Sequence, residues 1–367
     1  MSHLNKNVSE ALDKIKRVQA ARRQKFYLRD EHITMSHGSG GKATHNLIEG
    51  IFALAFANPL LAPMDDAAIL GNGEALGQRL AFTTDTYVVS PLFFPGGDIG
   101  KLAVHGTVND LAMAGATPRY LSAGFILEEG FAMADLRRIV DSMAQAAQAA
   151  GVAIVTGDTK VVERGKADGV FINTAGIGVI EATWSIGQSY VRPGDKILIS
   201  GPVGNHGIAI MLAREELDLE TDIESDSAAL HTLVADLLAA VGDSLHCLKD
   251  PTRGGIATSL NEIAFASEVG IALAERLVPV DPGVRGACEI LGLDYLTIAN
   301  EGKLLAIVAG DQAEAALATM RAHPLGQRAA LVGEVRAEPP GMVFLQTELG
   351  GTRVLDMLVG DPLPRIC

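Results

Sequence analysis

One segment bears most on the fold: Val152-Ala153-Ile154-Val155-Thr156-Gly157-Asp158. It joins an apolar run of strand length to a glycine and a carboxylate. Two other segments resemble it: Leu80-Ala81-Phe82-Thr83-Thr84-Asp85 ends in aspartate, and Lys196-Ile197-Leu198-Ile199-Ser200-Gly201 ends in a glycine-rich turn. Short apolar runs bounded by turn residues are typical of buried strands. These segments therefore predict strands with polar residues at their ends.

Helical patterns separate these strands. Apolar residues of segment 136–143 fall on one helical face, and Gly151 ends that helix. Segments 100–116 and 228–241 are further apolar helices. A chain of 367 residues is too long for one small core, so we expect two domains, with a boundary near residue 186. The composition suits an α/β or α+β protein.

Charge and hydropathy exclude several classes of protein. The chain has 44 acidic and 30 basic residues, a net charge of −14, which argues against nucleic acid as a partner. No apolar run reaches membrane-spanning length, and the basic residues 1–25 lack a signal-peptide core. Three cysteines form no disulfide framework, so the cytoplasm is the expected compartment.

Aspartates recur at five sites, each beside small or apolar residues where an isolated charge is costly to bury. Mg²⁺ takes a few carboxylates and completes its shell with water and phosphate oxygens. The alternative is a set of helix caps and turn residues, which explains any one site well but all five together poorly. The expected nucleotide-binding residues are Asp65, Asp66, Asp85, Asp110, Asp158 and Asp250, and all of these except Asp65 are expected to hold Mg²⁺.

Residues 36–42, with the sequence SHGSGGK, form a candidate phosphate loop. Glycines Gly38, Gly40 and Gly41 let backbone N–H groups converge on an anion, and Lys42 adds a positive charge. The segment does not match the P-loop pattern, which starts with glycine and has Ser or Thr after the lysine. Taken alone, it is also consistent with a flexible loop.

Two cation–carboxylate motifs suit proton transfer or charge stabilisation. Lys160 follows Asp158, and Glu301 lies in Asn300-Glu301-Gly302-Lys303. Ordinary surface pairs have the same appearance. We interpret His206 as a turn residue, and Cys247 and Cys288 as core residues.

The chain ends in Asp361-Pro362-Leu363-Pro364-Arg365-Ile366-Cys367, which places a thiol on the last residue. Two prolines favour extended backbone, so these residues span roughly 20–25 Å, and Gly360 is a candidate hinge. A frayed terminus that happens to end in cysteine is the alternative. An arm that carries a reactive thiol is the interpretation that the rest of the chain favours.

In combination these motifs resemble the HypE family, the carbamoyl dehydratases of [NiFe]-hydrogenase maturation. The resemblance runs from about residue 33 to the C-terminus, with the motifs in order, and residues 1–30 are longer than is usual in the family. The motifs are His37-Gly38-Ser39-Gly40-Gly41-Lys42, Thr84-Asp85-Thr86-Tyr87-Val88-Val89, Phe93-Phe94-Pro95-Gly96-Gly97, Gly157-Asp158-Thr159-Lys160-Val161-Val162, Asp250-Pro251-Thr252-Arg253-Gly254-Gly255, Asn300-Glu301-Gly302-Lys303 and Pro364-Arg365-Ile366-Cys367.

The resemblance implies a two-domain α+β fold like that of aminoimidazole ribonucleotide synthetase. The implied parts are an N-terminal extension (1–32), an ATP-binding and dimerisation domain (33–185), a second α+β domain (186–345) and a terminal strand with a flexible tail (346–367). Strands of the first domain are expected to pair across a homodimer.

The implied reaction is the ATP-dependent dehydration of a carbamoyl group carried on Cys367. The carbamoyltransferase HypF loads the thiol, ATP phosphorylates the carbamoyl oxygen, and loss of phosphate leaves a thiocyanate. The cyano group then passes to iron on a HypC–HypD scaffold. Glu301 is the candidate base for the N–H protons, and Lys160 is the candidate that stabilises charge on oxygen.

Two other functions compete with this one. A small-molecule kinase or synthetase of the same superfamily needs the aspartates but no terminal thiol. A non-catalytic carrier of a group on Cys367 needs no aspartates. ATP hydrolysis that depends on a carbamoylated Cys367 separates the three.

Overall fold

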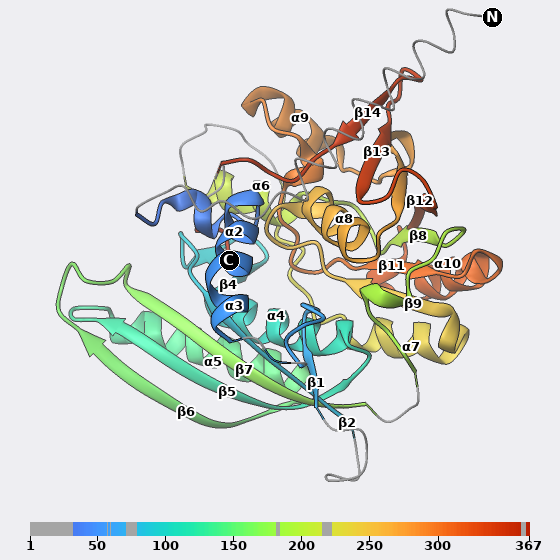
Figure 1. Ribbon diagram of the computed structural model, residues 1–367. Helices are drawn as coiled ribbons and strands as arrows, with labels where there is room; N and C mark the ends of the chain where they lie inside the picture. The colour runs from blue at the N-terminus through green and yellow to red at the C-terminus, as the bar shows by residue number, and fades with distance from the viewer. Residues whose placement is uncertain are drawn as a thin grey trace, which may run out of the picture.

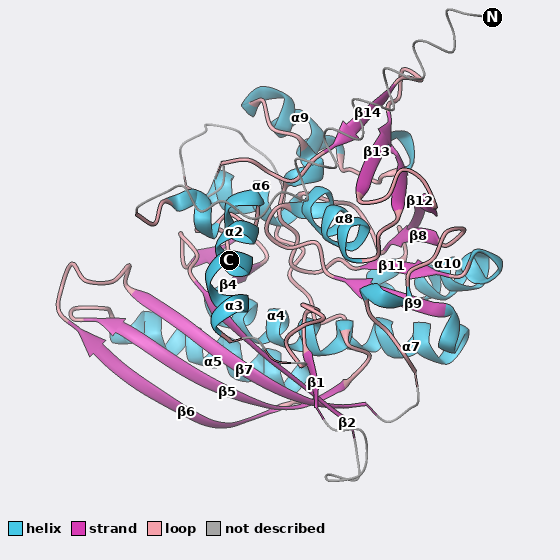
Figure 2. Cartoon of the chain, viewed as in Figure 1, coloured by secondary structure: helices cyan, strands magenta, loops and turns pink. Residues whose placement is uncertain are grey.

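The computed structural model contains two mixed β-sheets, each packed against helices (Figures 1 and 2). It describes residues 32–56, 58, 60–70, 79–180, 184–214, 222–360 and 365–367. The predicted N-terminal extension (1–32) lies outside these residues, apart from its last position.

The first sheet has five strands in the order β1-β2-β7-β5-β6. All neighbours are antiparallel except β5 and β6, which are parallel because α5 connects them. The strands are β1 (Ala68–Leu70), β2 (Arg79–Tyr87), β5 (Thr117–Glu128), β6 (Ala153–Val162) and β7 (Val170–Ile180).

One face of this sheet packs against α4 (Ile99–Met113) and α5 (Met133–Ala149), and the other face is open (Figure 1). The register shows which side chains share the open face. Phe82, Ile177 and Tyr120 are cross-strand neighbours, and all three are exposed. The open face therefore presents apolar side chains to solvent.

The second sheet has seven strands in the order β14-β13-β10-β12-β8-β11-β9. Buried aliphatic residues on both sides of its central strands form most of the core. Its strands are β8 (Lys196–Ile199), β9 (Leu245–Lys249), β10 (Gly270–Ala274), β11 (Leu305–Val308), β12 (Ala330–Arg336), β13 (Met342–Gln346) and β14 (Thr352–Leu355). Its helices are α6 (Asn205–Ala213), α7 (His231–Val241), α8 (Gly255–Ala266), α9 (Pro282–Leu291) and α10 (Ala313–Ala322).

Short elements complete the chain. They are η1 (Met35–Gly38), α2 (Lys42–Leu47), the π-helical turn η2 (Ile48–Phe52), α3 (Ala53–Ala55), and the hairpin of β3 (Phe93–Phe94) and β4 (Gly97–Asp98). Further single 3₁₀ turns are η3 (Gln188–Tyr190), η4 (Gly242–Ser244), η5 (Glu275–Leu277), η6 (Tyr295–Thr297), η7 (Gly310–Gln312) and η8 (Pro324–Gly326).

The strands and helices expected from the sequence are confirmed. The three quoted strand segments correspond to β2, β6 and β8, and the three helices to α5, α4 and α7. The chain passes from the first sheet to the second between residues 180 and 196, and the predicted boundary near 186 lies in this connection. Among the described residues, no helix combines the length and the hydropathy needed to cross a membrane.

Candidate functional site

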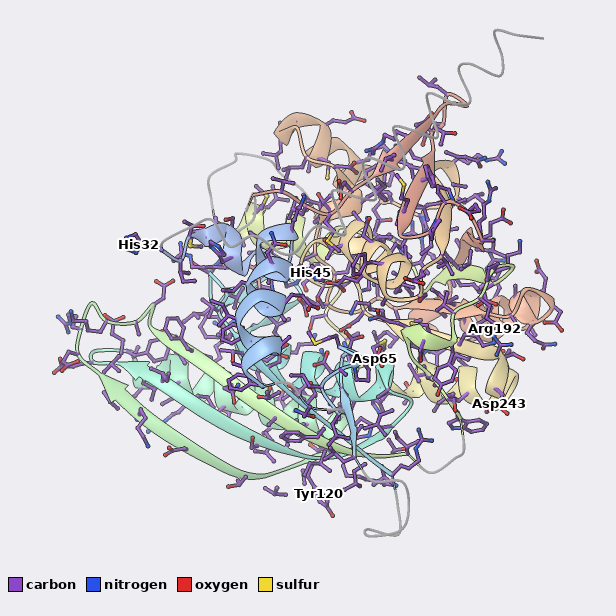
Figure 3. All side chains as sticks on the ribbon, in the orientation of Figure 1. His32, His45, Asp65, Tyr120, Arg192 and Asp243 are labelled. Atoms are coloured by element: carbon purple, nitrogen blue, oxygen red, sulfur yellow. The ribbon has the colours of Figure 1, made fainter. Side chains whose placement is uncertain are left out.

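A cavity of about 560 Å³ lies between the two sheets. Its walls come from the glycine loop and α2, from the segment before β1, and from the end of β9 with the start of α8. Figure 3 shows Asp65 and His45 on the sides of this region. Acidic residues from three separate segments, Asp65-Asp66, Asp110 and Asp250, line one cavity. We call it the acidic cavity.

Hydrogen bonds fix these carboxylates in place. Asp66 accepts from the Lys249 ammonium at 2.6 Å. Asp110, on α4, accepts from the Thr83 hydroxyl at 2.8 Å, and that hydroxyl also lies 3.0 Å from the backbone oxygen of Asp66. Asp250 follows β9 directly and is buried. The acidic cavity is thus built where β2, α4 and β9 meet.

Burial and mutual repulsion perturb these groups strongly. Burial, with the charges of Asp250 and Asp85, raises the pKa of Asp110 well above its usual range. Burial, with the charge of Asp66, raises the pKa of Asp250 to about 7, although Lys249 opposes this. Carboxyls that raise one another's pKa in this way are a good site for a cation, which would relieve both effects.

The residues of this site fit Mg²⁺ only if water and a phosphate complete its coordination shell. Within the described parts of the chain, no three His, Cys, Asp or Glu residues are placed to chelate an ion by themselves. Mg²⁺ commonly uses only one or two carboxylates and fills its shell with water and phosphate oxygens. The Thr258 hydroxyl, which also lines the acidic cavity, has no hydrogen-bond partner among the described residues and offers a further contact for a ligand. The residues therefore suit a metal that arrives with a phosphate ligand.

The raised pKa of Asp250 predicts a pH-dependent stability. A carboxyl whose pKa is higher in the folded state stabilises the fold below its unfolded pKa and loses that contribution as pH rises through the folded value, about 7. We expect the ligand-free protein to melt at lower temperature as pH rises between about 4 and 7, with up to ~4 kcal/mol from Asp250 over that range. Asp250→Asn should flatten this dependence, measured by differential scanning calorimetry.

Asp243→Asn is the matched control for that experiment. Asp243 is exposed in η4, just before β9, and its substitution should leave the pH dependence unchanged. Equal slopes for wild type and Asp250→Asn would show that Asp250 is not the titrating group.

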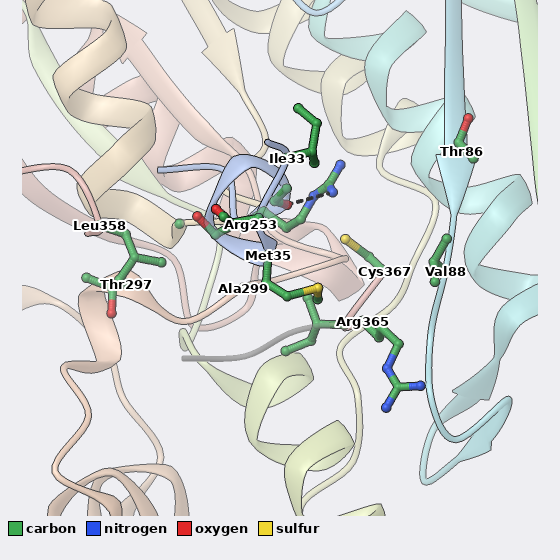
Figure 4. Close-up of a pocket in the computed structure, with 15 residues that line it drawn as sticks. Ile33, Met35, Thr86, Val88, Arg253, Thr297, Ala299, Leu358, Arg365 and Cys367 are labelled. Atoms are coloured by element: carbon green, nitrogen blue, oxygen red, sulfur yellow. Dashed lines mark hydrogen bonds between the residues drawn. The ribbon is translucent and has the colours of Figure 1, made fainter. Parts of the chain in front are cut away.

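The C-terminal thiol lies in a second cavity of about 290 Å³. Figure 4 shows Cys367, Arg253, Thr86 and Val88 around it. Arg253 lines both cavities, so the two are neighbours. We call this second space the tail cavity.

The environment of the thiol corrects one cause inferred from the sequence. From the covalent structure alone, like-charge repulsion from the neighbouring terminal carboxylate predicts a raised pKa for Cys367, with Arg365 as the cation that opposes it. The pKa is raised, but burial is the main cause, and Arg253 is the cation that opposes it. Arg365 instead pairs with Asp168. In this docked position the thiol is protonated and a poor nucleophile.

Glu301 is buried and contacts the thiol. Its carboxyl is hydrogen-bonded to Cys367, and its Oε1 has no hydrogen-bond partner among the described residues. Burial and the charges of Asp250, Asp85 and Asp226 raise the pKa of Glu301 well above its usual range. The structure thus brings Cys367 and Glu301 close to two of the predicted aspartates. Asp85 belongs to the first sheet and Asp250 follows a strand of the second, so both domains contribute to the site.

The glycine loop lies between the cavities. Gly38 lines the tail cavity and Gly40 the acidic cavity. Gly40 has φ +73°, and a Cβ on Gly41 would lie 2.2 Å from the Leu358 oxygen, so both positions require glycine. Lys42, at the start of α2, is exposed and lines neither cavity.

Asp158 and Lys160 lie elsewhere in the chain. They belong to β6, pair with each other at 2.6 Å, and are 73% and 68% exposed. Through the register with β5 and β7, Asp158 shares the open face of the first sheet with Asn173 and Thr86. This chain alone therefore does not bring them to either cavity.

Three residues of the site were missed in the sequence. Lys249 directly precedes Asp250 and Arg253 follows it by three residues, and two cations this close in sequence to a candidate site carboxylate were the available signal. His206, interpreted as a turn residue, lies in α6, is fully buried, and bonds to the tail. Its neighbours are far apart in the chain, so sequence reasoning had no signal for it.

Comparison with known proteins identifies the family of the chain. Residues 64–180 match the N-terminal domain and residues 192–346 the C-terminal domain of the AIR synthase related protein family. The chain is 56% identical over 347 residues to the carbamoyl dehydratase HypE of Rhizobium leguminosarum bv. viciae, covering 95% of this chain and 98% of the relative.

Two solved structures are also similar. A HypE–HypF complex has a TM-score of 0.80 at 49% identity, covering 85% of this chain and 99% of the other. HypE in complex with ATP has a TM-score of 0.76 at 51% identity, covering 92% and 100%. The resemblance and the two-domain fold expected from the sequence are confirmed, and the chain belongs to the HypE family of carbamoyl dehydratases.

Proposed function

We propose that the protein dehydrates a carbamoyl group carried on the Cys367 thiol to a thiocyanate, at the expense of ATP, and so supplies the cyanide ligands of the [NiFe]-hydrogenase iron. The observation that carries this proposal is the placement of the terminal thiol against a buried glutamate, in a cavity that shares Arg253 with the acidic cavity. A thiol beside a nucleotide site is what a tethered substrate needs.

The acidic cavity is the proposed nucleotide site. The volume of this cavity, about 560 Å³, is within the range of ordinary ligand pockets. The structure of a similar protein, HypE, has been solved in complex with ATP. Asp66, Asp110 and Asp250 line this cavity and would hold Mg²⁺ there. Asp85, whose charge acts on Asp110, is the further candidate ligand. Bound there, Mg²⁺ would draw negative charge from the phosphates. The Gly40 backbone and Arg253, which both line this cavity, would contact the phosphate that faces the tail.

The chemistry requires a phosphorylated carbamoyl oxygen and the loss of two N–H protons. The carbamoyl C–O bond breaks as phosphate leaves, and the nitrogen lone pair and the N–H electrons form the C≡N triple bond. Glu301 is the proposed proton acceptor, since its carboxyl already touches the sulfur. Its raised pKa means that it must first lose its own proton, which the charges of Asp85 and Asp250 oppose.

Asp250→Asn tests the nucleotide site. A neutral amide loses its attraction for the cation, so we expect Mg-ATP affinity to fall by about tenfold or more, corresponding to ~1.4 kcal/mol. ATP without metal should be affected less. Isothermal titration calorimetry with and without Mg²⁺ measures both, with Asp243→Asn as the control. Unchanged Mg-ATP affinity would make Asp250 a structural residue only.

A homodimer completes this proposal. The open face of the first sheet carries Phe82, Tyr120 and Ile177, with Asp158 and Lys160 further along the same face. Figure 3 shows Tyr120 on the outside of this sheet. A second copy would cover these side chains and pair with edge strand β6, which places Asp158 and Lys160 at the interface. From this interface, Lys160 would stabilise the negative charge that develops on the carbamoyl oxygen.

Tyr120→Asp should break this dimer. A charge buried in an apolar interface costs several kcal/mol, so we expect association to weaken by ~100-fold or more. Sedimentation velocity should show a dimer for wild type and a monomer for the variant. Leu349→Asp, at a fully exposed position after β13, is the control. A wild-type monomer, or a dimeric Tyr120→Asp variant, would rule out this interface.

Intact-mass analysis tests the proposed function directly. Incubation with a HypF-type carbamoyltransferase, carbamoyl phosphate and ATP should add one carbamoyl group, after which the protein should lose the mass of one water. Peptide mapping should place both changes on Cys367. A protein that never gains the carbamoyl group would refute the proposal. A HypC–HypD scaffold as acceptor of the cyano group, and a cytoplasmic location, remain predictions.

A further inference from the structure

The docked tail is held at the residue before the thiol. The Nε2 atom of His206 lies 2.7 Å from the backbone oxygen of Ile366, and both residues are buried. The Ile366 side chain belongs to the core, and Ile366 forms a β-bridge with Val89. These contacts of Ile366 therefore fix how far the tail enters the tail cavity, and with it the position of Cys367.

Exposed contacts hold the preceding residue. The Arg365 oxygen accepts from Ser90 N at 3.1 Å and from an Arg214 nitrogen at 2.9 Å. Arg365 itself pairs with Asp168, and both side chains are about half exposed. Exposed ion pairs contribute little to stability. The buried bond to His206 is the contact best placed to decide the register of the tail.

The partners of His206 determine its tautomer. A carbonyl oxygen only accepts, so Nε2 carries the hydrogen and donates it to Ile366. Burial lowers the pKa of His206, so the ring is neutral and Nδ1 accepts from the Ser225 hydroxyl at 2.8 Å. Phe94 packs edge-on against the ring at 5.7 Å between centroids. The donor is thus pre-oriented before the tail arrives.

The same loop also holds Glu301. Asp226, next to Ser225, accepts from the Glu301 backbone N–H at 3.0 Å and pairs with Lys303 at 3.1 Å. The segment 225–226 therefore holds both parts of the site: Ser225 orients the His206 ring that binds the tail, and Asp226 binds the Glu301 backbone. A shift of this loop would move the donor and the glutamate together.

We propose that His206 is the positioning residue for the tail: its Nε2–H bond to Ile366 sets the register that brings the Cys367 sulfur to Glu301. This inference rests on the proposed function, because only a tail that carries a substrate needs such a register. Without the bond, docking would leave the Ile366 oxygen buried without its His206 partner. The undocked tail, whose carbonyl is hydrated, would then be favoured.

Alkylation of Cys367 by iodoacetamide in the isolated protein tests the register. The docked thiol is only partly exposed and burial raises its pKa, so it reacts slowly in place, and a faster rate reports how often the tail leaves its cavity. We expect His206→Phe, which keeps an aromatic ring against Phe94, to raise the rate by about tenfold to a hundredfold. His206→Gln, whose amide places a donor near the position of Nε2, should stay within about threefold of wild type. Peptide mapping should confirm that Cys367 is the site.

Two further variants complete the test. Ser225→Ala removes the partner that orients the ring, and it should raise the rate less than His206→Phe does. His231→Phe, on α7 and outside the lining of the tail cavity, should leave it unchanged. With carbamoylated protein, the dehydration rate should fall in His206→Phe and recover in His206→Gln, while Mg-ATP affinity stays constant because His206 does not line the acidic cavity.

The possible outcomes distinguish the role of His206 in holding the tail from the proposed dehydration of a carbamoyl group. Equal alkylation rates in wild type, His206→Phe and Ser225→Ala would overturn the role of His206. So would a His206→Gln variant as fast as His206→Phe. If wild type is never carbamoylated by the transferase, the proposed function fails, but the alkylation rates still decide whether His206 holds the tail.

Discussion

Glu301→Gln is expected to stop the reaction after Cys367 has been carbamoylated and to slow dehydration by ~10²–10⁴-fold. Gln cannot accept the N–H protons, whereas loading by the transferase is expected to take place with the tail out of its cavity and without Glu301. Mass spectrometry should show the carbamoyl form accumulating, without the later loss of one water. The fold should tolerate the change, since burial already favours the neutral form of this carboxyl.

Glu334→Gln is the matched control. Glu334 lies on β12, bonds to Lys196 at 2.8 Å, and lines neither cavity. Its variant should dehydrate at the wild-type rate. Formation of cyano-Cys367 by Glu301→Gln at the wild-type rate would assign the base to another group.

Cys367→Ala should abolish both the carbamoyl adduct and cyanide formation, because no other described cysteine is accessible: Cys247 and Cys288 are buried. Affinity for ATP should stay within a few fold of wild type. None of residues 365–367 lines the acidic cavity, and the shared wall residue Arg253 remains. Calorimetry with ATP and intact-mass analysis measure the two effects separately.

Cys288→Ala serves as the control for this experiment, since Cys288 is a core residue of α9 and should not affect loading. Loss of ATP binding in Cys367→Ala would make the tail part of the nucleotide site. Carbamoylation of Cys367→Ala would place the reactive group on a different residue.

The sequence allowed the strands, the helices and the family to be predicted, because apolar periodicity and contiguous motifs are local signals. Thus β6 and α5 were predicted from runs such as 152–158 and 136–143. The clustering of Asp66, Asp110 and Asp250 in one cavity was expected only as a group, since their spacing along the chain carries no distance in space.

Other features depend on tertiary contacts that no local pattern encodes. His206 looked like a turn residue next to glycines, yet it is the buried partner of a carbonyl 160 residues away. The raised pKa of Cys367 was inferred from its covalent neighbours, but burial is the larger cause. The positions of Asp158 and Lys160 on an outer strand became visible only through the register of β5, β6 and β7.

The tail that ends in Cys367 also determines the kinetic order of the proposed reaction. Because the reacting group stays covalently attached to the catalyst, its local concentration is set by the length of chain after β14, and tethers of this kind give millimolar values. Dehydration should therefore follow first-order kinetics at any protein concentration, with no Michaelis constant for the carbamoyl group. A small carbamoylated thiol added to Cys367→Ala should turn over only as it approaches that millimolar range.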